Sequence, residues 1–225
     1  MARRRIGLYG GSFDPVHAGH LEVAQKVSKL FDIDLLLFIP AEVAPHKVGR
    51  NVTSSFHRHA MLALATQNDP LLMISTYELN GPDRRYTVDT LKHFLRIFLD
   101  DEIFFLMGAD SWEEIHTWRE WKLLLSLTNH IVVTRPGYEI DVERLGPSVV
   151  ERVVDLRGDS SGSVVSGPRI FLTDVVQKDI SATQIRNAAA SQNLDQLSKL
   201  VPAAVAEYIS KYRLYRNSNE TEFYS

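Results

Sequence analysis

The chain has 225 residues, of which 44% are hydrophobic and 24% are charged, as in an ordinary globular protein. Its formal net charge of −3 argues against a generic polybasic binder of nucleic acids or membranes. Cysteine is absent, which excludes disulfides, thiolate nucleophiles and cysteine-ligated zinc.

Short apolar runs alternate with amphipathic helical patterns along most of the chain. Strands are predicted at residues 5–9, 34–39, 72–75, 103–107, 130–134 and 170–172. Helices are predicted at residues 19–31, 56–67, 88–98, 182–190, 194–199 and 202–211. Apolar strands separated by helices favour an α/β fold, a Rossmann-like doubly wound parallel sheet with helices on both faces and a small C-terminal helical region.

We expect a single domain over residues 1–216, with its core at about 1–150. A Gly- and Ser-rich stretch at 155–168 predicts a flexible insertion, the helical part covers about 181–213, and residues 217–225 form a frayed tail. The apolar run that follows three N-terminal arginines is too short for a signal peptide, and no run approaches the length of a membrane span. The expected localisation is cytoplasmic.

The most informative motif is Gly-Gly-Ser-Phe-Asp-Pro-Val-His-Ala-Gly-His at residues 10–20, between the first strand and the first helix. Its glycines allow a sharp turn, and a helix N-terminus offers free N–H groups to an anion. His17 and His20 project from one side of the first turn, and Gly19 leaves space for something flat. A lone histidine is more often a cap or a partly buried residue, but the whole string predicts a phosphate site.

Residues 10–20 resemble the nucleotidyltransferase superfamily that carries a His-x-Gly-His signature. Further blocks up to Arg216 are similar to one of its members, the bacterial nicotinate-nucleotide adenylyltransferase family. The resemblance implies transfer of AMP from ATP to nicotinate mononucleotide, giving deamido-NAD and pyrophosphate in NAD biosynthesis. It also implies Mg²⁺ bound with ATP, small-molecule substrates, and neither a nucleic acid nor a membrane as partner. The oligomeric state stays open, a homo-oligomer included.

The resemblance also implies roles for individual residues. The catalytic residues would be His17, His20, Lys47 and Arg186. The ATP site would comprise Gly10, Gly11, Ser12, Phe13, His17, Gly19, His20, Gly108, Asp110, Ile180, Ser181 and Arg186. The mononucleotide site would comprise Ser12, Phe13, His46, Lys47, Tyr86, Thr87, Trp118 and Arg135. No residue is assigned to a metal.

Two of these assignments involve a predicted helix N-terminus. If Tyr86 and Thr87 open a helix, its N–H groups would bind the carboxylate of a nicotinate ring, on which Trp118 would stack. Ser181 and Gln184 form a capping-box pattern, so a second helix N-terminus would meet phosphates. Structural readings remain open: a plain helix start with Thr87 as cap, a surface lysine at Lys47, and a salt bridge at Arg135.

A mononucleotide phosphate is already a nucleophile, so the expected reaction is direct in-line attack on ATP without a covalent intermediate. Two alternatives stay open. One is an adenylyltransferase that acts on nicotinamide mononucleotide or another phosphate acceptor, because Arg85 stands where the family usually has a small residue. The other is a catalytically silent nucleotide sensor on the same fold.

Overall fold

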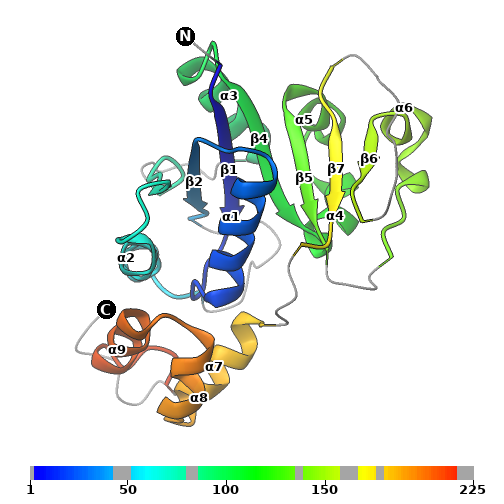
Figure 1. Ribbon diagram of the computed structural model, residues 1–225. Helices are drawn as coiled ribbons and strands as arrows, with labels where there is room; N and C mark the ends of the chain where they lie inside the picture. The colour runs from blue at the N-terminus through cyan, green and yellow to red at the C-terminus, as the bar shows by residue number, and fades with distance from the viewer. Residues whose placement is uncertain are drawn as a thin grey trace.

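The computed structural model describes residues 3–42, 52–79, 86–134, 139–157, 167–175 and 180–216. In these ranges seven strands form one sheet whose neighbouring strands are all parallel (Figure 1). They are β1 (Arg5–Gly11), β2 (Leu35–Pro40), β3 (Leu72–Ile74), β4 (Glu102–Gly108), β5 (Asn129–Val133), β6 (Val153–Asp155) and β7 (Ile170–Thr173). Their order in the sheet is β3-β2-β1-β4-β5-β7-β6, which confirms the predicted Rossmann-like α/β class.

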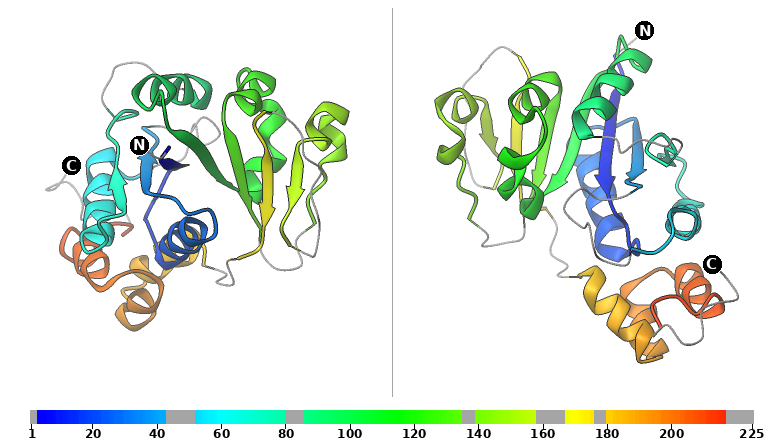
Figure 2. Two further views of the ribbon diagram at one scale, coloured as in Figure 1. Left: turned by 45° about the horizontal axis from the view of Figure 1, so that its top comes forward. Right: turned by 180° about the vertical axis from the view of Figure 1, so that it is seen from behind.

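Helices cover both faces of this sheet, as Figure 2 shows for α1 and α3. The α-helices are α1 (Ala18–Leu30), α2 (Ser55–Thr66), α3 (Thr87–Ile97), α4 (Ala109–Glu113), α5 (Trp121–Leu127), α6 (Pro147–Val150), α7 (Ala182–Ala190), α8 (Leu194–Leu200) and α9 (Ala203–Lys211). Buried side chains of α1 and α2 belong to one apolar cluster, and those of α3, α4, α5 and α6 belong to another. The two clusters are the two faces of the doubly wound sheet.

The strands supply both clusters because successive side chains of a strand point to opposite faces. In β4, Phe104 and Leu106 belong to the cluster of α1 and α2, whereas Phe105 and Met107 belong to the cluster of α3 and α5. All four are 4% exposed or less. This burial on both faces explains why the strand reads as an unbroken apolar run in the sequence.

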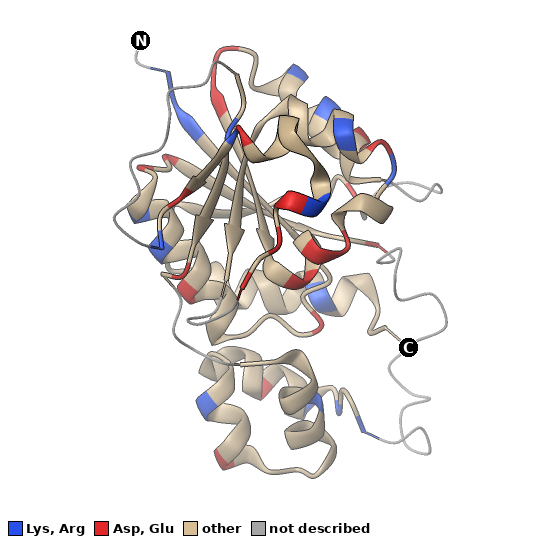
Figure 3. Ribbon diagram, turned by 90° about the vertical axis from the view of Figure 1, so that its right-hand side faces the viewer, with Lys and Arg blue, Asp and Glu red and all other residues tan. Residues whose placement is uncertain are grey.

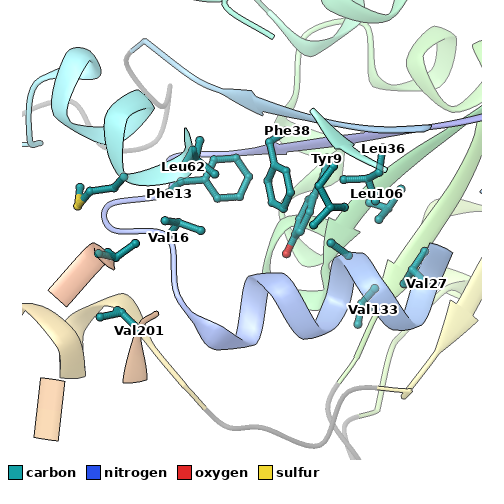
Figure 4. Close-up of a cluster of buried hydrophobic side chains, with 14 of the residues drawn as sticks. Tyr9, Phe13, Val16, Val27, Leu36, Phe38, Leu62, Leu106, Val133 and Val201 are labelled. Atoms are coloured by element: carbon teal, nitrogen blue, oxygen red, sulfur yellow. The ribbon is translucent and has the colours of Figure 1, made fainter. Parts of the chain in front are cut away.

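The C-terminal helices α7, α8 and α9 lie beyond the carboxyl ends of β1 and β2 (Figure 1). Val201 and Val205 belong to the same buried cluster as Phe13 and Val16 of the loop after β1, and Figure 4 labels Val201, Phe13 and Val16. The C-terminal region therefore shares a core with the sheet and packs directly on the loop that the sequence singles out.

Several short elements differ from the sequence-based expectations. We predicted no strand at β6 and no helix at α4, α5 or α6, because elements of three to seven residues are too short to show a periodic pattern. The sheet also runs to Thr173, beyond the expected core boundary at 150, and Asp155 ends β6 rather than beginning an insertion. Residues 158–166, which make up most of that expected insertion, lie outside the described residues.

Figure 3 shows both basic and acidic residues on the elements around the sheet and on the C-terminal helices. None of the helices in the described ranges combines the length and the apolar character that a bilayer crossing needs.

Candidate active site

A cavity of about 510 Å³ opens at the carboxyl edge of the sheet, where β1 and β4 lie side by side. The chain winds outward in opposite directions from this point, and in doubly wound sheets ligands bind there. The volume suits a small-molecule ligand. The lining residues are Tyr9, Gly10, Gly11, Ser12, Phe13, His20, Ile39, Ala41, Glu78, Tyr86, Thr87, Thr90, Phe105, Met107, Gly108, Asp110, Ser111, Glu114, Thr117, Trp118, Arg119 and Leu124.

The loop after β1 forms one wall of this cavity. A Cβ atom on Gly11 would lie 2.9 Å from the ring of Phe13, so any other residue there would displace that ring. Phe13 has a φ of 46°, in the left-handed region, which costs on the order of 1 kcal/mol. Its ring is 1% exposed and packs edge-on against Tyr9 and His20, at centroid distances of 5.5 and 5.0 Å. Aromatic packing thus holds the loop in a strained shape that turns its backbone toward the cavity.

His17 and His20 form a pair at the N-terminus of α1. The Nδ1 atom of His17 accepts from the backbone N–H of His20 at 3.4 Å, and the Nδ1 atom of His20 accepts from the N–H of His17 at 3.3 Å. The rings stack with centroids 3.6 Å apart. Because each Nδ1 is an acceptor in this capping box, each ring carries its proton on Nε2. The Nε2–H of each ring is therefore its donor group.

Gly19 leaves room for this arrangement. A Cβ atom at this position would lie 3.0 Å from Nδ1 of His17. The imidazole of His17, which is 7% exposed, lies beside Gly19, where the sequence predicted space for something flat.

A second helix N-terminus lies next to the first. Ser181 caps α7 and forms the predicted capping box with Gln184. The guanidinium of Arg186 donates to the carbonyl of Asp14, in the loop after β1, at 2.8 Å. Ile180 lies 3.7 Å from the place of a Gly19 Cβ atom. Two positive helix ends therefore converge beside one loop, which favours a bound anion.

The far end of the cavity is aromatic. Tyr86 is the N-cap of α3, so Thr87 is the first residue of that helix and not its cap as one expectation had it. Trp118 lies nearby, and the guanidinium of Arg119 sits 4.7 Å from the centre of the Tyr86 ring. Aromatic faces beside a helix N-terminus suit a planar ring that bears an anionic group.

Three carboxylates also line the cavity. Glu78 accepts a hydrogen bond of 2.6 Å from the hydroxyl of Thr90, which fixes one of them. Asp110, in the first turn of α4, and Glu114 are exposed on the cavity wall. Among the lining residues within the described ranges, Arg119 is the single lysine or arginine.

The cavity brings together most of the residues that the sequence assigned to a site. Those that line it are Gly10, Gly11, Ser12, Phe13, His20, Tyr86, Thr87, Gly108, Asp110 and Trp118. Beside it, at the two helix N-termini, lie His17, Gly19, Ile180, Ser181 and Arg186. The predicted residues His46, Lys47 and Arg135 lie outside the described residues, as does Arg85.

Sequence reasoning gave no role to several polar lining residues, among them Glu78, Thr90 and Arg119. Arg119 directly follows Trp118, and a cation beside an aromatic residue assigned to a ligand is the signal that could have found it. Glu78 and Thr90 are twelve positions apart, and no spacing rule links them.

No group of three or more His, Asp or Glu side chains in the described ranges could hold a metal ion. The donor set of the cavity, with Asp110 exposed beside a predicted phosphate site, fits a cation that is held mainly by phosphate oxygens and water.

Comparisons of the sequence with a family model and with curated proteins agree on one family. The cytidylyltransferase-like family model matches residues 8–188. A probable nicotinate-nucleotide adenylyltransferase of Thermoanaerobacter sp. (strain X514) is 37% identical over 217 residues, which cover 96% of each chain. A relative with the same description from Corynebacterium glutamicum is 34% identical and covers 95% of this chain and 89% of its own.

Solved structures share the fold. Nicotinic acid mononucleotide adenylyltransferase of Plasmodium falciparum, complexed with NaAD, superposes with a TM-score of 0.73 at 22% identity, over 95% of this chain and 98% of that one. A putative nicotinate-nucleotide adenylyltransferase of Vibrio parahaemolyticus superposes with a TM-score of 0.60 at 17% identity, over 96% of this chain and 97% of that one.

Proposed function

The chain belongs to the nicotinate-nucleotide adenylyltransferases of the cytidylyltransferase-like family, and we propose that it transfers AMP from ATP to nicotinate mononucleotide. The products are deamido-NAD and pyrophosphate, and the reaction is a step of NAD biosynthesis. Relatives more than 30% identical over nearly the whole chain carry this description, and a neighbour of the same fold was solved with NaAD.

One observation carries the proposal. A single cavity joins a glycine-rich loop at a helix N-terminus to an aromatic end with a second helix N-terminus. The first end suits the phosphates of a nucleotide, and the second suits a pyridine ring with a carboxylate. A dinucleotide product needs both ends in one site.

The reaction is a direct displacement. An oxygen of the mononucleotide phosphate attacks the α-phosphorus of ATP, the new P–O bond forms, and the bond to pyrophosphate breaks. His17 and His20 offer Nε2–H donors to the phosphate oxygens, since both Nδ1 atoms are engaged in the helix cap. The N-termini of α1 and α7 and the guanidinium of Arg186 add positive potential as charge moves to the leaving group. Lys47 is the further cation that the sequence assigns to this step.

The proposed site favours nicotinate mononucleotide over nicotinamide mononucleotide. A nicotinate carboxylate enters a space lined by Glu78, Asp110 and Glu114, so it needs positive potential near the ring. The N–H groups of the first turn of α3 supply part of it, and the guanidinium of Arg119, which also pairs with Glu120 at 3.6 Å, adds positive potential beside Tyr86. An amide ring gains less from both.

In this proposal Asp110, an exposed carboxylate of the cavity wall, would help to hold a Mg²⁺ ion that is bound mainly by the triphosphate and water. The ion would supply neutralisation of the phosphate charge.

The test is pyrophosphate release from ATP and Mg²⁺ with either nicotinate mononucleotide or nicotinamide mononucleotide as acceptor. The proposal expects release only when both substrates are present, one dinucleotide formed per pyrophosphate, and a strong preference for the acid. Hydrolysis of ATP without an acceptor, or no release with either mononucleotide, would contradict it.

A further inference from the structure

Arg58 is a buried arginine in α2 that no step above uses. It is 1% exposed, although arginine is almost never fully buried without a partner. Its guanidinium donates from Nη1 to the carbonyl of Ser12 at 2.7 Å, from Nε to the carbonyl of Thr53 at 2.9 Å, and from Nη2 to the carbonyl of Glu42 at 3.0 Å. One side chain thus joins the loop after β1, the end of β2 and the approach to α2.

The bond to Ser12 orients a peptide of the candidate phosphate loop. In a trans peptide the C=O and the following N–H point in opposite directions. With the carbonyl of Ser12 turned toward Arg58, the N–H of Phe13 points away from Arg58. Ser12 and Phe13 line the cavity, and Arg58 does not. The bond therefore directs the N–H of Phe13 to the cavity side, where a phosphate oxygen would accept it.

The neighbours of Arg58 belong to the same loop. Asp14, 6% exposed, accepts from the hydroxyl of Tyr215 at 2.8 Å and from the N–H of Thr53 at 3.3 Å. Arg186 donates to the carbonyl of Asp14. Burial lowers the pKa of Arg58, and the nearby carboxylate of Asp14 opposes that shift. The guanidinium groups of Arg58 and Arg186 therefore lie beside the loop, and the carboxylates of Asp14 and Glu42 act on the charge of Arg58.

We propose that Arg58 is a positioning residue for adenylyl transfer, because it holds the Ser12–Phe13 peptide with its N–H toward the bound phosphates and places a buried positive charge behind that loop. A lysine cannot replace it, since an ammonium group lacks the planar fork that reaches three carbonyls at once. This inference depends on the proposed function only in that its kinetic assay measures adenylyl transfer.

The experiment compares Arg58→Ala with Arg152→Ala. Arg152 is a matched control because its guanidinium also binds backbone carbonyls, those of Leu125 at 2.8 Å and Ser148 at 3.2 Å, and it lies outside the cavity lining. Each variant is assayed for kcat, for KM with ATP and with nicotinate mononucleotide, and for Tm, at a temperature at which both are folded.

We expect Arg58→Ala to lower kcat/KM for ATP by about 50-fold or more, which is on the order of the loss of one transition-state donor. We expect Arg152→Ala to lower Tm and to change kcat/KM less than threefold. Guanidinium ion at non-denaturing millimolar concentration should restore part of the activity of Arg58→Ala, because it can occupy the space between the three carbonyls. It should not raise the activity of Arg152→Ala.

A value of kcat/KM within threefold of wild type in Arg58→Ala would overturn the inference, as would equal losses in both arginine variants. If Arg58→Ala does not fold, Arg58→Lys replaces it, with an expected loss of at least tenfold at a Tm close to wild type. Full activity in Arg58→Lys would also overturn the inference. Failure of the wild type to form dinucleotide would instead overturn the proposed function, and binding of MgATP by calorimetry would then compare the same variants.

Discussion

At the scale of residues, the histidine pair explains how a short motif determines which ring nitrogen carries the proton. Each imidazole uses Nδ1 to accept a backbone N–H at the start of α1, so Nε2 of each ring carries the proton. His20 lines the cavity, whereas His17 lies behind it with 7% of its surface exposed. His20 therefore has more direct access than His17 to a ligand in the cavity.

Replacing His20 by Ala removes this donor and one half of the cap. We expect kcat to fall by about 10²- to 10³-fold, as for the loss of one preorganised donor, and stability to fall by about 1 kcal/mol. Steady-state pyrophosphate release and urea unfolding measure the two effects. His59→Ala, on α2 and outside the cavity lining, is the control and should keep kcat. A sensor without catalysis would lose only ligand affinity in the His20 variant.

Arg119 provides a test of ring selectivity. Changing it to Gln keeps most of its volume and removes the charge beside Tyr86. We expect the ratio of kcat/KM for the acid to that for the amide to fall on the order of tenfold, equivalent to about 1.4 kcal/mol. Lys122→Gln is the control, because it removes an equal charge that lies over Trp121 and outside the cavity lining. In this variant the ratio of kcat/KM for the acid to that for the amide should stay unchanged. An unchanged ratio in the Arg119 variant would contradict this prediction and would assign the selectivity to the N-terminus of α3.

At the scale of elements, the sequence predicts the long segments well. The strand at 103–107 and the helix at 182–190 agree with β4 and α7 to within one residue at each end, because an unbroken apolar run and a capping box mark them. The stretch at 10–20 was likewise predictable as the junction between β1 and α1 from its glycines, whereas its role as an anion site stays a prediction.

The remaining features depend on contacts between distant parts of the chain. Nothing in the sequence near Arg58 shows that its guanidinium reaches Ser12, 46 positions away. The hydrogen bond of Tyr215 to Asp14 spans 201 positions. The three-residue strand β6 gains its order from pairing with β7 and not from a local pattern. Tertiary packing determines all three features, and the periodicity of the sequence cannot predict them.

Gly19→Ala tests the junction between β1 and α1. Alanine favours a helix by up to about 1 kcal/mol, but its Cβ would lie 3.0 Å from the ring of His17 and would displace it. We expect kcat to fall at least tenfold while Tm shifts by only a few degrees. Gly7→Ala serves as the control, since its Cβ would press at 3.3 Å on Ile33 and Leu36 in the core; it should lower Tm and spare kcat. Normal turnover in Gly19→Ala would show that the ring stacking has no catalytic value.

At the scale of the whole molecule, one buried histidine couples stability to pH. His130 of β5 is 0% exposed, and its Nε2 bonds the carbonyl of Leu124 at 3.1 Å. Burial lowers the pKa of His130 from 6.5 to about 4. The unfolded chain therefore takes up a proton before the folded protein does, so this part of the stability is complete above pH 6.5 and is lost as the pH falls toward 4.

The His130→Gln variant lacks this titration. We expect it to be less stable than wild type at pH 7.5, and the difference in unfolding free energy to shrink by about 2 kcal/mol at pH 5. Urea unfolding of both proteins at the two pH values gives the result, because groups shared by both proteins cancel in the difference. A difference that stays constant with pH would mean that His130 is protonated equally in the folded and unfolded states.

The central claim is that this cavity joins ATP and nicotinate mononucleotide in one direct transfer. The most direct test uses ATP made chiral at the α-phosphorus with sulfur and determines the configuration of that phosphorus in the dinucleotide product. A single in-line displacement predicts deamido-NAD with inverted configuration. Retained configuration would require a covalent nucleotidyl intermediate, and the absence of labelled dinucleotide would contradict the transfer itself.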